Sequence, residues 1–375
     1  MRRALVAVTS LSLVVAPSTA VAQRAGQLIA ADPVVDTPGG MQAWRVRYWS
    51  LDASNRPQQL TGMVVAPREA IPGEPRPVIA WTHGTSGVAS NCAPSQSPNF
   101  WTATPALQSV RSGNVVVAPD YPGLGSNGVH PYLVGVPTAR STLDAVRAAR
   151  QIPGAAAGSR FAVWGESQGG HAALWTGQEA RRYAPDLQLV GVAAAAPPTD
   201  LIANLRSGKD PSIRAFLTAF TAYSWSRYYG APLSSLGNRQ TQGIITRLAQ
   251  NNCITLDTKP KLGTVLGVLA LRGDLQNVDL GTIQPWARHS RTNSASAAAI
   301  ATPLLIAQNP ADVIVDPATT RRFARQACAL NKRVRWIDIA GKGHETSAKD
   351  SAPATLEWIA NRFAGKPARS DCGRI

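Results

Sequence analysis

The sequence is poor in several residue types, and their scarcity excludes whole classes of protein. Asp and Glu number 22 against 38 Lys and Arg, and charged residues make up only 16% of the chain. Hydrophobic residues reach 44%, which is enough for a large core and excludes disorder, collagen and coiled coil. Beyond the N-terminal segment, no stretch approaches the roughly 18–20 apolar residues of a membrane span, and residues 262–271 come nearest. We therefore expect no stable membrane insertion.

A compact basic region is also missing, although the formal net charge is +16. The basic residues are mostly arginines that stand singly or in pairs, as at Arg181-Arg182 and Arg321-Arg322. The chain has no basic run, no Cys/His finger spacing and no aromatic-basic recognition segment. We expect a solvated surface and no nucleic-acid partner.

The N-terminus has the three parts of an export signal. Met1-Arg2-Arg3 is positively charged, residues 4–16 are apolar, and Ala20-Val21-Ala22 forms a small-x-small cleavage site. We expect residues 1–22 to be a signal peptide that is removed near Ala22/Gln23. The mature protein is then exported, to the periplasm or outside the cell.

Cysteine is scarce, and its four positions lack the C-x-x-C spacing of zinc or thioredoxin chemistry. Because an oxidising compartment preserves disulfides, we expect Cys92, Cys253, Cys328 and Cys372 to be paired. Four cysteines allow three pairings, and the residues alone do not choose among them.

Apolar strand-like runs alternate with helical patterns along most of the chain, which predicts a mostly parallel sheet flanked by helices. The expected strands are residues 45–49, 62–66, 78–82, 115–118, 161–164, 187–195, 304–308 and 334–339. The expected helices of this part are residues 102–111, 141–151, 168–183, 317–330 and 354–363.

The alternation fails over residues 197–301, which mix polar loops with helix-like segments at 213–223 and 241–248. We interpret this stretch as an inserted, mainly helical cap. It divides an α/β core into a first part, residues 23–196, and a second part, residues 302–375.

Gly165-Glu166-Ser167-Gln168-Gly169 fits the G-x-S-x-G pattern of a nucleophile elbow. The bare pattern is weak evidence, but this match directly follows a buried strand and precedes a helix, as an elbow requires. Ser167 is the candidate nucleophile. Glu166 could tune its surroundings, although a solvated or hydrogen-bonded elbow residue is the preferred interpretation.

A serine hydroxyl needs a histidine base and a carboxylate that orients it, and in this architecture both follow the serine in the chain. That order excludes His83 and His130. His171 lies on the elbow helix and His289 within the expected cap, whereas His344 follows a late strand at the sheet's carboxyl end, where open α/β sheets place their sites. We predict His344 as the base.

Two aspartates compete for the orienting acid. Asp312 follows the strand at 304–308 by a few residues, and Asp316 precedes Pro317 at the start of a helix, which is typical of a helix N-cap. We therefore predict Asp312 as the acid.

The oxyanion that forms on the attacked carbonyl needs backbone N–H donors. One should come from Gln168, the residue after the nucleophile, and the other from the loop His83-Gly84-Thr85. Asp120 and Tyr121 end a strand nearby and are expected to serve loop structure.

Cofactor patterns are absent. Gly123-Leu124-Gly125 lacks the full dinucleotide fingerprint, and His344-Glu345 is followed by Ala348 where a zinc-protease helix would need its second histidine. We expect no cofactor and no metal.

Four segments together resemble the secretory lipase family of α/β-hydrolases: WTHGTSGVASNCAPS at 81–95, APDYPGLG at 118–125, HPYLVG at 130–135 and VWGESQGGHAALW at 163–175. The resemblance spans most of the mature chain and is loose in the cap. It implies Ser167 as nucleophile, Asp312 as acid and His344 as base.

For the cysteines, the resemblance implies the pairs Cys92–Cys253 and Cys328–Cys372. Fungal relatives depart from His83-Gly84-Thr85, which leaves the second oxyanion donor between Thr85, our choice, and Ser86.

The resulting hypothesis is an exported serine carboxylic-ester hydrolase, a lipase or esterase that works through an acyl-enzyme. Its substrate is a small-molecule or lipid ester, the cap forms an acyl pocket, and contact with a lipid interface and the oligomeric state are left open. Alternatives with the same triad are an esterase for polymeric or antibiotic esters and an amidase. A noncatalytic binding protein with the hydrolase fold is a further alternative.

Overall fold

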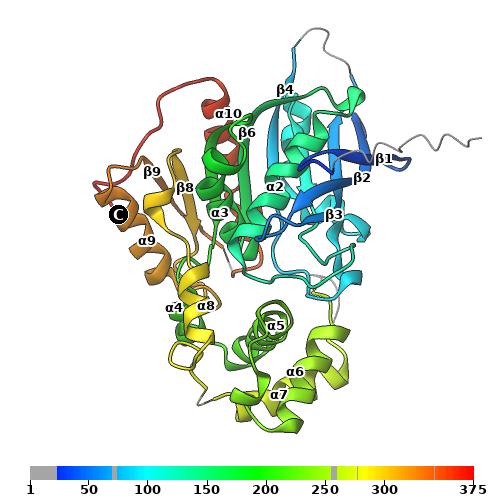
Figure 1. Cartoon of the computed structure of the whole chain (residues 1–375). Helices are drawn as coiled ribbons and strands as arrows, with labels where there is room; N and C mark the ends of the chain where they lie inside the picture. Colours follow the sequence, from blue (N-terminus) through cyan, green and yellow to red (C-terminus); the bar gives the residue numbers. More distant parts are fainter. Residues whose placement is uncertain (1–22, 70–73, 255–259, 277, 342) are drawn as a thin grey trace, which may run out of the picture.

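The computed structural model of the protein describes residues 23–69, 74–254, 260–276, 278–341 and 343–375. Its centre is a nine-stranded sheet (Figure 1). The strands are β1 (Leu28–Val34), β2 (Met41–Leu51), β3 (Pro57–Pro67), β4 (Arg76–Thr82), β5 (Val115–Pro119), β6 (Ala157–Glu166), β7 (Gln188–Ala195), β8 (Leu304–Gln308) and β9 (Val334–Asp338). The expected export signal, residues 1–22, lies outside the described residues.

The strand order is β1-β2-β3-β5-β4-β6-β7-β8-β9. Strands β1, β2, β3 and β5 pair antiparallel, and every pair from β5 onward is parallel. The expectation of a mostly parallel sheet is therefore confirmed. Strand β1 was not expected from the sequence, because it lies at the edge of the sheet, is largely half-buried or exposed, and contains Asp32 and Pro33.

Helices cover both faces of the sheet. The helices of the core are α1 (Phe100–Ala103), α2 (Gly135–Ala149), α3 (Gln168–Tyr183), α9 (Pro317–Ala329) and α10 (Ser347–Phe363), with 3₁₀ segments η1 (Ser90–Cys92), η2 (Pro94–Gln96), η3 (Pro105–Ser112) and η4 (Pro153–Ala155). Side chains of α2, α3 and α9 pack in one apolar cluster against one face, and those of η3 and α10 pack in a second cluster against the other. The sheet is thus the middle of three layers.

Two expected helices differ from the structure at a proline. The helix expected at 102–111 is α1 followed by η3, since Pro105 begins a new 3₁₀ segment where a continuous α-helix would need an amide hydrogen. The helix expected to begin at Ala354 begins at Ser347 and continues through Pro353. Helix α10 is therefore about two turns longer at the end that faces the candidate site.

Between β7 and β8 the described residues form helices rather than strands. These are α4 (Leu201–Ser207), α5 (Pro211–Tyr229), α6 (Arg239–Asn251), α7 (Leu262–Asp274) and α8 (Trp286–Asn293), with 3₁₀ segments η5 (Leu233–Ser235) and η6 (Ala297–Ala299). In Figure 1, α5, α6 and α7 stand below the sheet, and α4 and α8 lie to the left of α5, below α9. They surround an apolar cluster of their own, which includes Trp225, Leu271 and Trp286.

The two disulfides that the family resemblance implies are both present. Cys92–Cys253 has an S–S distance of 2.09 Å and joins the core to the end of α6. Cys328–Cys372 has an S–S distance of 2.03 Å and joins α9 to the C-terminal segment. The first pair closes the longer loop and connects the helices between β7 and β8 to the first half of the chain.

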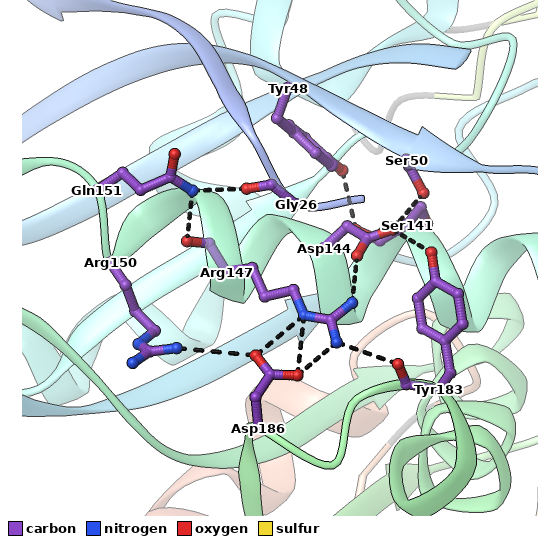
Figure 2. A network of polar contacts seen from close by, with 10 residues as sticks. All are labelled: Gly26, Tyr48, Ser50, Ser141, Asp144, Arg147, Arg150, Gln151, Tyr183 and Asp186. Carbon is purple, nitrogen blue, oxygen red and sulfur yellow. Dashed lines mark hydrogen bonds and ion pairs between the residues drawn. The ribbon is translucent and has the colours of Figure 1, made fainter. Parts of the chain in front are cut away.

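A buried polar network ties β2, α2 and α3 together on the side of the sheet where α2 lies (Figure 2). At its centre, Asp144 accepts hydrogen bonds from Ser50 Oγ and Tyr183 Oη, each at 2.7 Å, and from Arg147 Nη1 at 2.9 Å. Arg147 also forms an ion pair with Asp186. Because every partner of Asp144 comes from a packed element, the network fixes how these elements meet.

Candidate active site

Ser167 occupies a sharp turn between β6 and α3. Its backbone has φ 55° and ψ −121°, a sparsely populated conformation for a residue with a side chain. The flanking glycines are required there, since a Cβ on Gly169 would lie 1.9 Å from the carbonyl oxygen of Thr82, and one on Gly165 would lie 2.0 Å from Thr82 Oγ1. The elbow predicted from G-x-S-x-G is therefore present as a strained turn packed against β4.

A chain of two hydrogen bonds connects Ser167, His344 and Asp312. Ser167 Oγ lies 2.8 Å from His344 Nε2, and His344 Nδ1 lies 2.8 Å from Asp312 Oδ2. Residues 312 and 344 follow β8 and β9, so the carboxyl ends of neighbouring parallel strands bring them to the elbow. In the neutral imidazole, Nδ1–H donates to the carboxylate and Nε2 accepts the serine proton.

Asp312 is held by donors of its own loop as well as by the imidazole. Its Oδ1 accepts the backbone N–H groups of Ile314 and Val315 at 2.8 and 3.0 Å, and its Oδ2 accepts Gln308 Nε2 at 3.0 Å. Burial acts to raise the pKa of Asp312, but the hydrogen bond and charge of His344 and these backbone donors outweigh it and hold the pKa below its usual value. The acid is therefore ionised at neutral pH.

Asp316, the competing acid, caps α9, as expected of an aspartate before proline. Its Oδ1 accepts the N–H of Ala318 at 3.2 Å. The structure brings Asp312 to His344 and uses Asp316 to begin the helix.

His344 is buried, with 7% of its surface exposed. Burial acts to lower its pKa, but the hydrogen bond and charge of Asp312, joined by the charges of Glu166 and Glu345, raise the pKa above the usual 6.5. A more basic imidazole accepts a proton from a hydroxyl more readily.

The other four histidines are engaged elsewhere. His171 Nε2 donates to the carbonyl of Asn293 at 2.7 Å, and the ring of His289 stacks on Tyr229 with centroids 4.0 Å apart. Burial lowers the pKa of His83 to about 4 and that of His130 to about 3, so both are neutral at pH 7. Of the five histidines, the structure brings His344 to Ser167.

The predicted oxyanion donors lie on the two segments that border the nucleophile. Gln168 is the first residue of α3, and its side-chain amide donates to His130 Nε2 at 3.0 Å. A Cβ on Gly84 would lie 4.0 Å from that of Ser167, and the next residue, Thr85, forms a 2.9 Å hydrogen bond with Tyr132 Oη. The structure thus brings the loop that carries Thr85 to the elbow.

His130 and Tyr132 were not assigned a role from the sequence. His130 Nδ1 donates to the carbonyl of Pro122 at 3.0 Å, which leaves Nε2 to accept from Gln168. The segment HPYLVG was visible as a motif, but only the fold brings it beside both expected oxyanion segments.

Asp120 serves loop structure as expected, because its carboxylate accepts hydrogen bonds from Ser95 and Thr61.

A cavity of about 70 Å³ opens beside Ser167 and Gln168. Its lining is mostly apolar and comes from the turn after His130, from α4 and α5, and from the loop after Asp312. The lining residues besides Ser167 and Gln168 are Tyr132, Leu133, Pro198, Leu201, Asn204, Leu205, Arg214, Leu217, Thr221, Trp225, Ile314 and Val315. Sequence reasoning expected a pocket from the cap but did not name these residues, although Leu217, Thr221 and Trp225 recur at the four-residue spacing of one helix face.

Among the described residues, no group of three or more His, Cys, Asp or Glu side chains is arranged to hold a metal ion. Within the same part of the chain, no helix is long and apolar enough to span a membrane.

The mostly parallel sheet, the strained serine turn and the loops at the carboxyl ends of β8 and β9 define an α/β-hydrolase. The family model described as secretory lipase matches residues 102–222 and 283–371, which is more than half of the sequence. The chain belongs to the secretory lipase family, and it is a hydrolase of the lipase and esterase class. The interval between the two matched segments contains α6 and α7.

Among curated relatives, a probable inactive lipase of Mycobacterium tuberculosis is 24% identical over 351 residues, covering 88% of this chain and 75% of that protein. Lipase 9 of Candida albicans is 24% identical over 356 residues, covering 89% and 76%.

Among solved structures, Candida antarctica lipase A in its closed state has a TM-score of 0.77 at 20% identity, covering 96% of this chain and 86% of that one. The rice cell wall degrading esterase LipA of Xanthomonas oryzae has a TM-score of 0.71 at 20% identity, covering 91% and 98%. At these identities the solved structures establish the fold alone.

Proposed function

We propose that the protein is an exported serine carboxylic-ester hydrolase in which Ser167 is the nucleophile, His344 the base and Asp312 the orienting acid. The observation that carries the proposal is the pair of 2.8 Å hydrogen bonds from Ser167 through His344 to Asp312. In this arrangement the hydroxyl is activated by a base whose tautomer and orientation are fixed by a carboxylate.

The reaction proceeds through an acyl-enzyme. Ser167 Oγ attacks the ester carbonyl while its proton passes to His344 Nε2, and the imidazolium is stabilised by Asp312. The oxyanion accepts from the backbone N–H groups of Gln168 and Thr85, with Ser86 as the alternative second donor. The alcohol leaves with the proton from His344, and a water activated by the same imidazole then hydrolyses the acyl-enzyme.

The cavity beside Ser167 is proposed as the acyl pocket, with residues 197–301 as the cap that closes it. Its volume of about 70 Å³ lies well below the roughly 300–1,000 Å³ of pockets that enclose drug-sized ligands. Its lining is largely apolar. Together these features favour esters with a short apolar acyl group.

Contact with a lipid interface is supported by α7. The helix exposes a stripe of apolar side chains at the i, i+3, i+4 and i+7 positions of one face, and we call it the α7 stripe. Its members are Leu262 (74% exposed), Val265 (39%), Leu266 (58%) and Leu269 (52%). Lys261 and Arg272 flank the stripe and form no ion pair with the described residues. Apolar side chains between cations suit the surface of an anionic lipid layer.

Export is supported by the family and by the two disulfides. We propose that residues 1–22 are the signal peptide and that cleavage occurs near Ala22/Gln23. The N-terminal sequence of the mature protein tests this point.

The first experiment treats mature protein with a fluorophosphonate probe and measures p-nitrophenyl esters of increasing acyl length. Ser167→Ala should abolish labelling and lower kcat by about 10³-fold or more. Ser207→Ala is a matched control and should keep both, since Ser207 Oγ is buried in α4 and has no hydrogen-bond partner among the described residues. Labelling that survives in Ser167→Ala would remove Ser167 as the nucleophile.

The same series separates the alternatives. A p-nitroanilide of equal acyl length tests the amidase, and a polymeric ester tests an esterase for polymers. If the wild-type protein neither reacts with the probe nor hydrolyses any ester, the noncatalytic binding protein is favoured. One relative is itself named a probable inactive lipase.

A second experiment tests the α7 stripe by cosedimentation of the Ser167→Ala protein with phosphatidylcholine vesicles, with and without phosphatidylglycerol. Leu266→Ser with Leu269→Ser should lower binding about tenfold or more, because two apolar side chains lose their contact with lipid. The matched control, Val35→Ser with Leu330→Ser, removes exposed apolar residues elsewhere and should bind like the parent. Equal binding of the α7 double variant would overturn the lipid contact and leave the esterase proposal intact.

A further inference from the structure

Glu166, the residue before the nucleophile, is partly buried and hydrogen-bonded. It ends β6, and its Oε1 accepts the backbone N–H of Ala348 at 2.7 Å. Ala348 is the second residue of α10, so the carboxylate sits at the N-terminus of a 17-residue helix, where N–H groups and the helix dipole favour a negative charge. The expected hydrogen-bonded elbow residue is thus observed, but its partner lies 182 positions away.

That partner belongs to the same turn that carries the histidine. The N–H of Ser347 donates to the carbonyl of His344 at 3.2 Å, and the N–H of Asp350 donates to the carbonyl of Thr346 at 2.7 Å. The segment from His344 to Asp350 is therefore one hydrogen-bonded unit at the start of α10. Glu166 attaches this unit to the residue adjoining Ser167.

We propose that Glu166 is a positioning residue: its carboxylate fixes the start of α10, and with it His344, relative to Ser167, and its charge sets the pH range in which His344 is a base. The proposal rests on the hydrolase function proposed above. It gives the second residue of the G-x-S-x-G motif a role in the reaction without contact with the substrate.

The electrostatics around Glu166 are consistent with this role. Burial raises the pKa of Glu166 to about 7, opposed by the hydrogen bond from Ala348 and by the charge of His344; the charges of Asp350 and Glu345 add to the increase. Conversely, the negative charge of Glu166 contributes to the raised pKa of His344, after the larger contribution of Asp312 and before that of Glu345. These acidic groups and the imidazole titrate as one coupled set.

Loss of the Glu166 charge should extend the activity of the protein to lower pH. His344 must be neutral to act as a base, so kcat/KM falls as pH drops through the pKa of the free enzyme's imidazole. Replacing Glu166 by Gln keeps an acceptor for the Ala348 N–H but removes the negative charge that the carboxyl gains as pH rises through its pKa of about 7. The imidazole then loses its proton at lower pH, and the acid limb of the kcat/KM profile moves downward.

The experiment compares Glu166→Ala, Glu166→Gln and Glu345→Gln with the wild type on a soluble short-chain ester. Glu166→Ala should lower kcat by roughly 10–10²-fold with little change in KM, since a misplaced base slows the chemistry rather than binding. Glu166→Gln should recover most of kcat and shift the acid limb downward by about half a pH unit or more. Glu345→Gln is the matched control: Glu345 is exposed, so its loss should leave kcat unchanged and move the limb less.

Wild-type kcat in Glu166→Ala, or an unmoved acid limb in Glu166→Gln, would overturn the proposal. A second measurement that does not depend on turnover is needed in case Glu166→Ala folds poorly or the protein has no esterase activity. In Ser167→Ala protein, an NMR titration of the His344 imidazole with and without Glu166→Gln should show the lower pKa independently of turnover. An unchanged imidazole pKa there rejects the role of Glu166, whereas the fluorophosphonate probe alone decides the role of Ser167.

Discussion

Two buried aspartates can be compared: Asp312 in the candidate active site and Asp144 in the network of Figure 2. Each is held by hydrogen bonds and is paired with a basic residue. Both are about as buried as a side chain can be, at 1% and 0% exposure. They differ in the partner. Asp312 faces His344, which can gain or lose a proton near neutral pH, and Asp144 faces Arg147, which is always charged.

The two aspartates also differ in the element that carries them and in the direction of their pKa shifts. Asp312 lies in a loop at the carboxyl end of β8, and its pKa is lowered by the imidazole and by backbone donors. Asp144 lies within α2, where burial raises its pKa against the hydrogen bonds from Tyr183, Ser50 and Arg147. A buried carboxylate is therefore not in itself a sign of chemistry. The proton-carrying partner, and the path from it to a cavity, distinguish the site from the scaffold.

The largest effect that tests the contrast between Asp312 and Asp144 is expected for Asp312→Asn. The asparagine fills the same space but cannot stabilise the imidazolium, and it favours the wrong imidazole tautomer, so kcat should fall by about 10⁴-fold. Steady-state kinetics on a soluble ester measure the loss. Its matched control, Asp316→Asn, changes the neighbouring aspartate that caps α9 and should leave kcat close to wild type.

A fall in kcat that is equally large for both variants would assign the effect to damage of the loop between β8 and α9 and not to the pair with His344. Activity at the wild-type level in Asp312→Asn would remove the distinction between the two networks altogether.

The candidate site was largely predictable from the sequence because its signals are local. G-x-S-x-G between an apolar strand and a helix specifies the turn at Ser167, and His344 and Asp312 each follow a short apolar strand. Parallel strands bring their carboxyl ends to one edge, so the order of these segments in the chain was enough to expect the three residues together. The catalytic roles themselves remain predictions for the experiments above.

The rest depended on contacts between segments with no common pattern. The network of Asp144 joins Ser50, Arg147 and Tyr183 from three elements, and none of these residue types is unusual at its own position. The bond from Glu166 to Ala348 could not be anticipated for the same reason, and the expectation that α10 begins after Pro353 concealed it. Edge strand β1 was missed because exposure removes the apolar alternation that marks a strand.

The lining of the cavity lies between these two cases. A helix at 213–223 was expected, and α5 extends it to Pro211–Tyr229. Trp225, which lines the cavity, falls within the added part of the helix. The helical period indicated a buried face, but only the arrangement of α4 and α5 over the elbow makes that face a wall of the cavity.

The smaller expected effect concerns the scaffold. Asp144→Ala removes the acceptor shared by Ser50, Tyr183 and Arg147 and leaves their buried donors unpaired. The free energy of unfolding, measured by urea denaturation, should fall by about 2–4 kcal/mol, because donors of Ser50, Tyr183 and Arg147 lose their acceptor while Arg147 keeps its ion pair with Asp186. Below the unfolding transition kcat/KM should stay at the wild-type value, since the network does not contact the cavity.

Asp186→Ala is the control on the same arginine: Asp186 is 45% exposed, and its loss should cost less than about 1 kcal/mol. If the two variants lose equal stability, burial does not separate the two carboxylates that bind Arg147; if Asp144→Ala lowers kcat/KM while the protein remains folded, the scaffold network is coupled to the site, and the contrast with Asp312 fails.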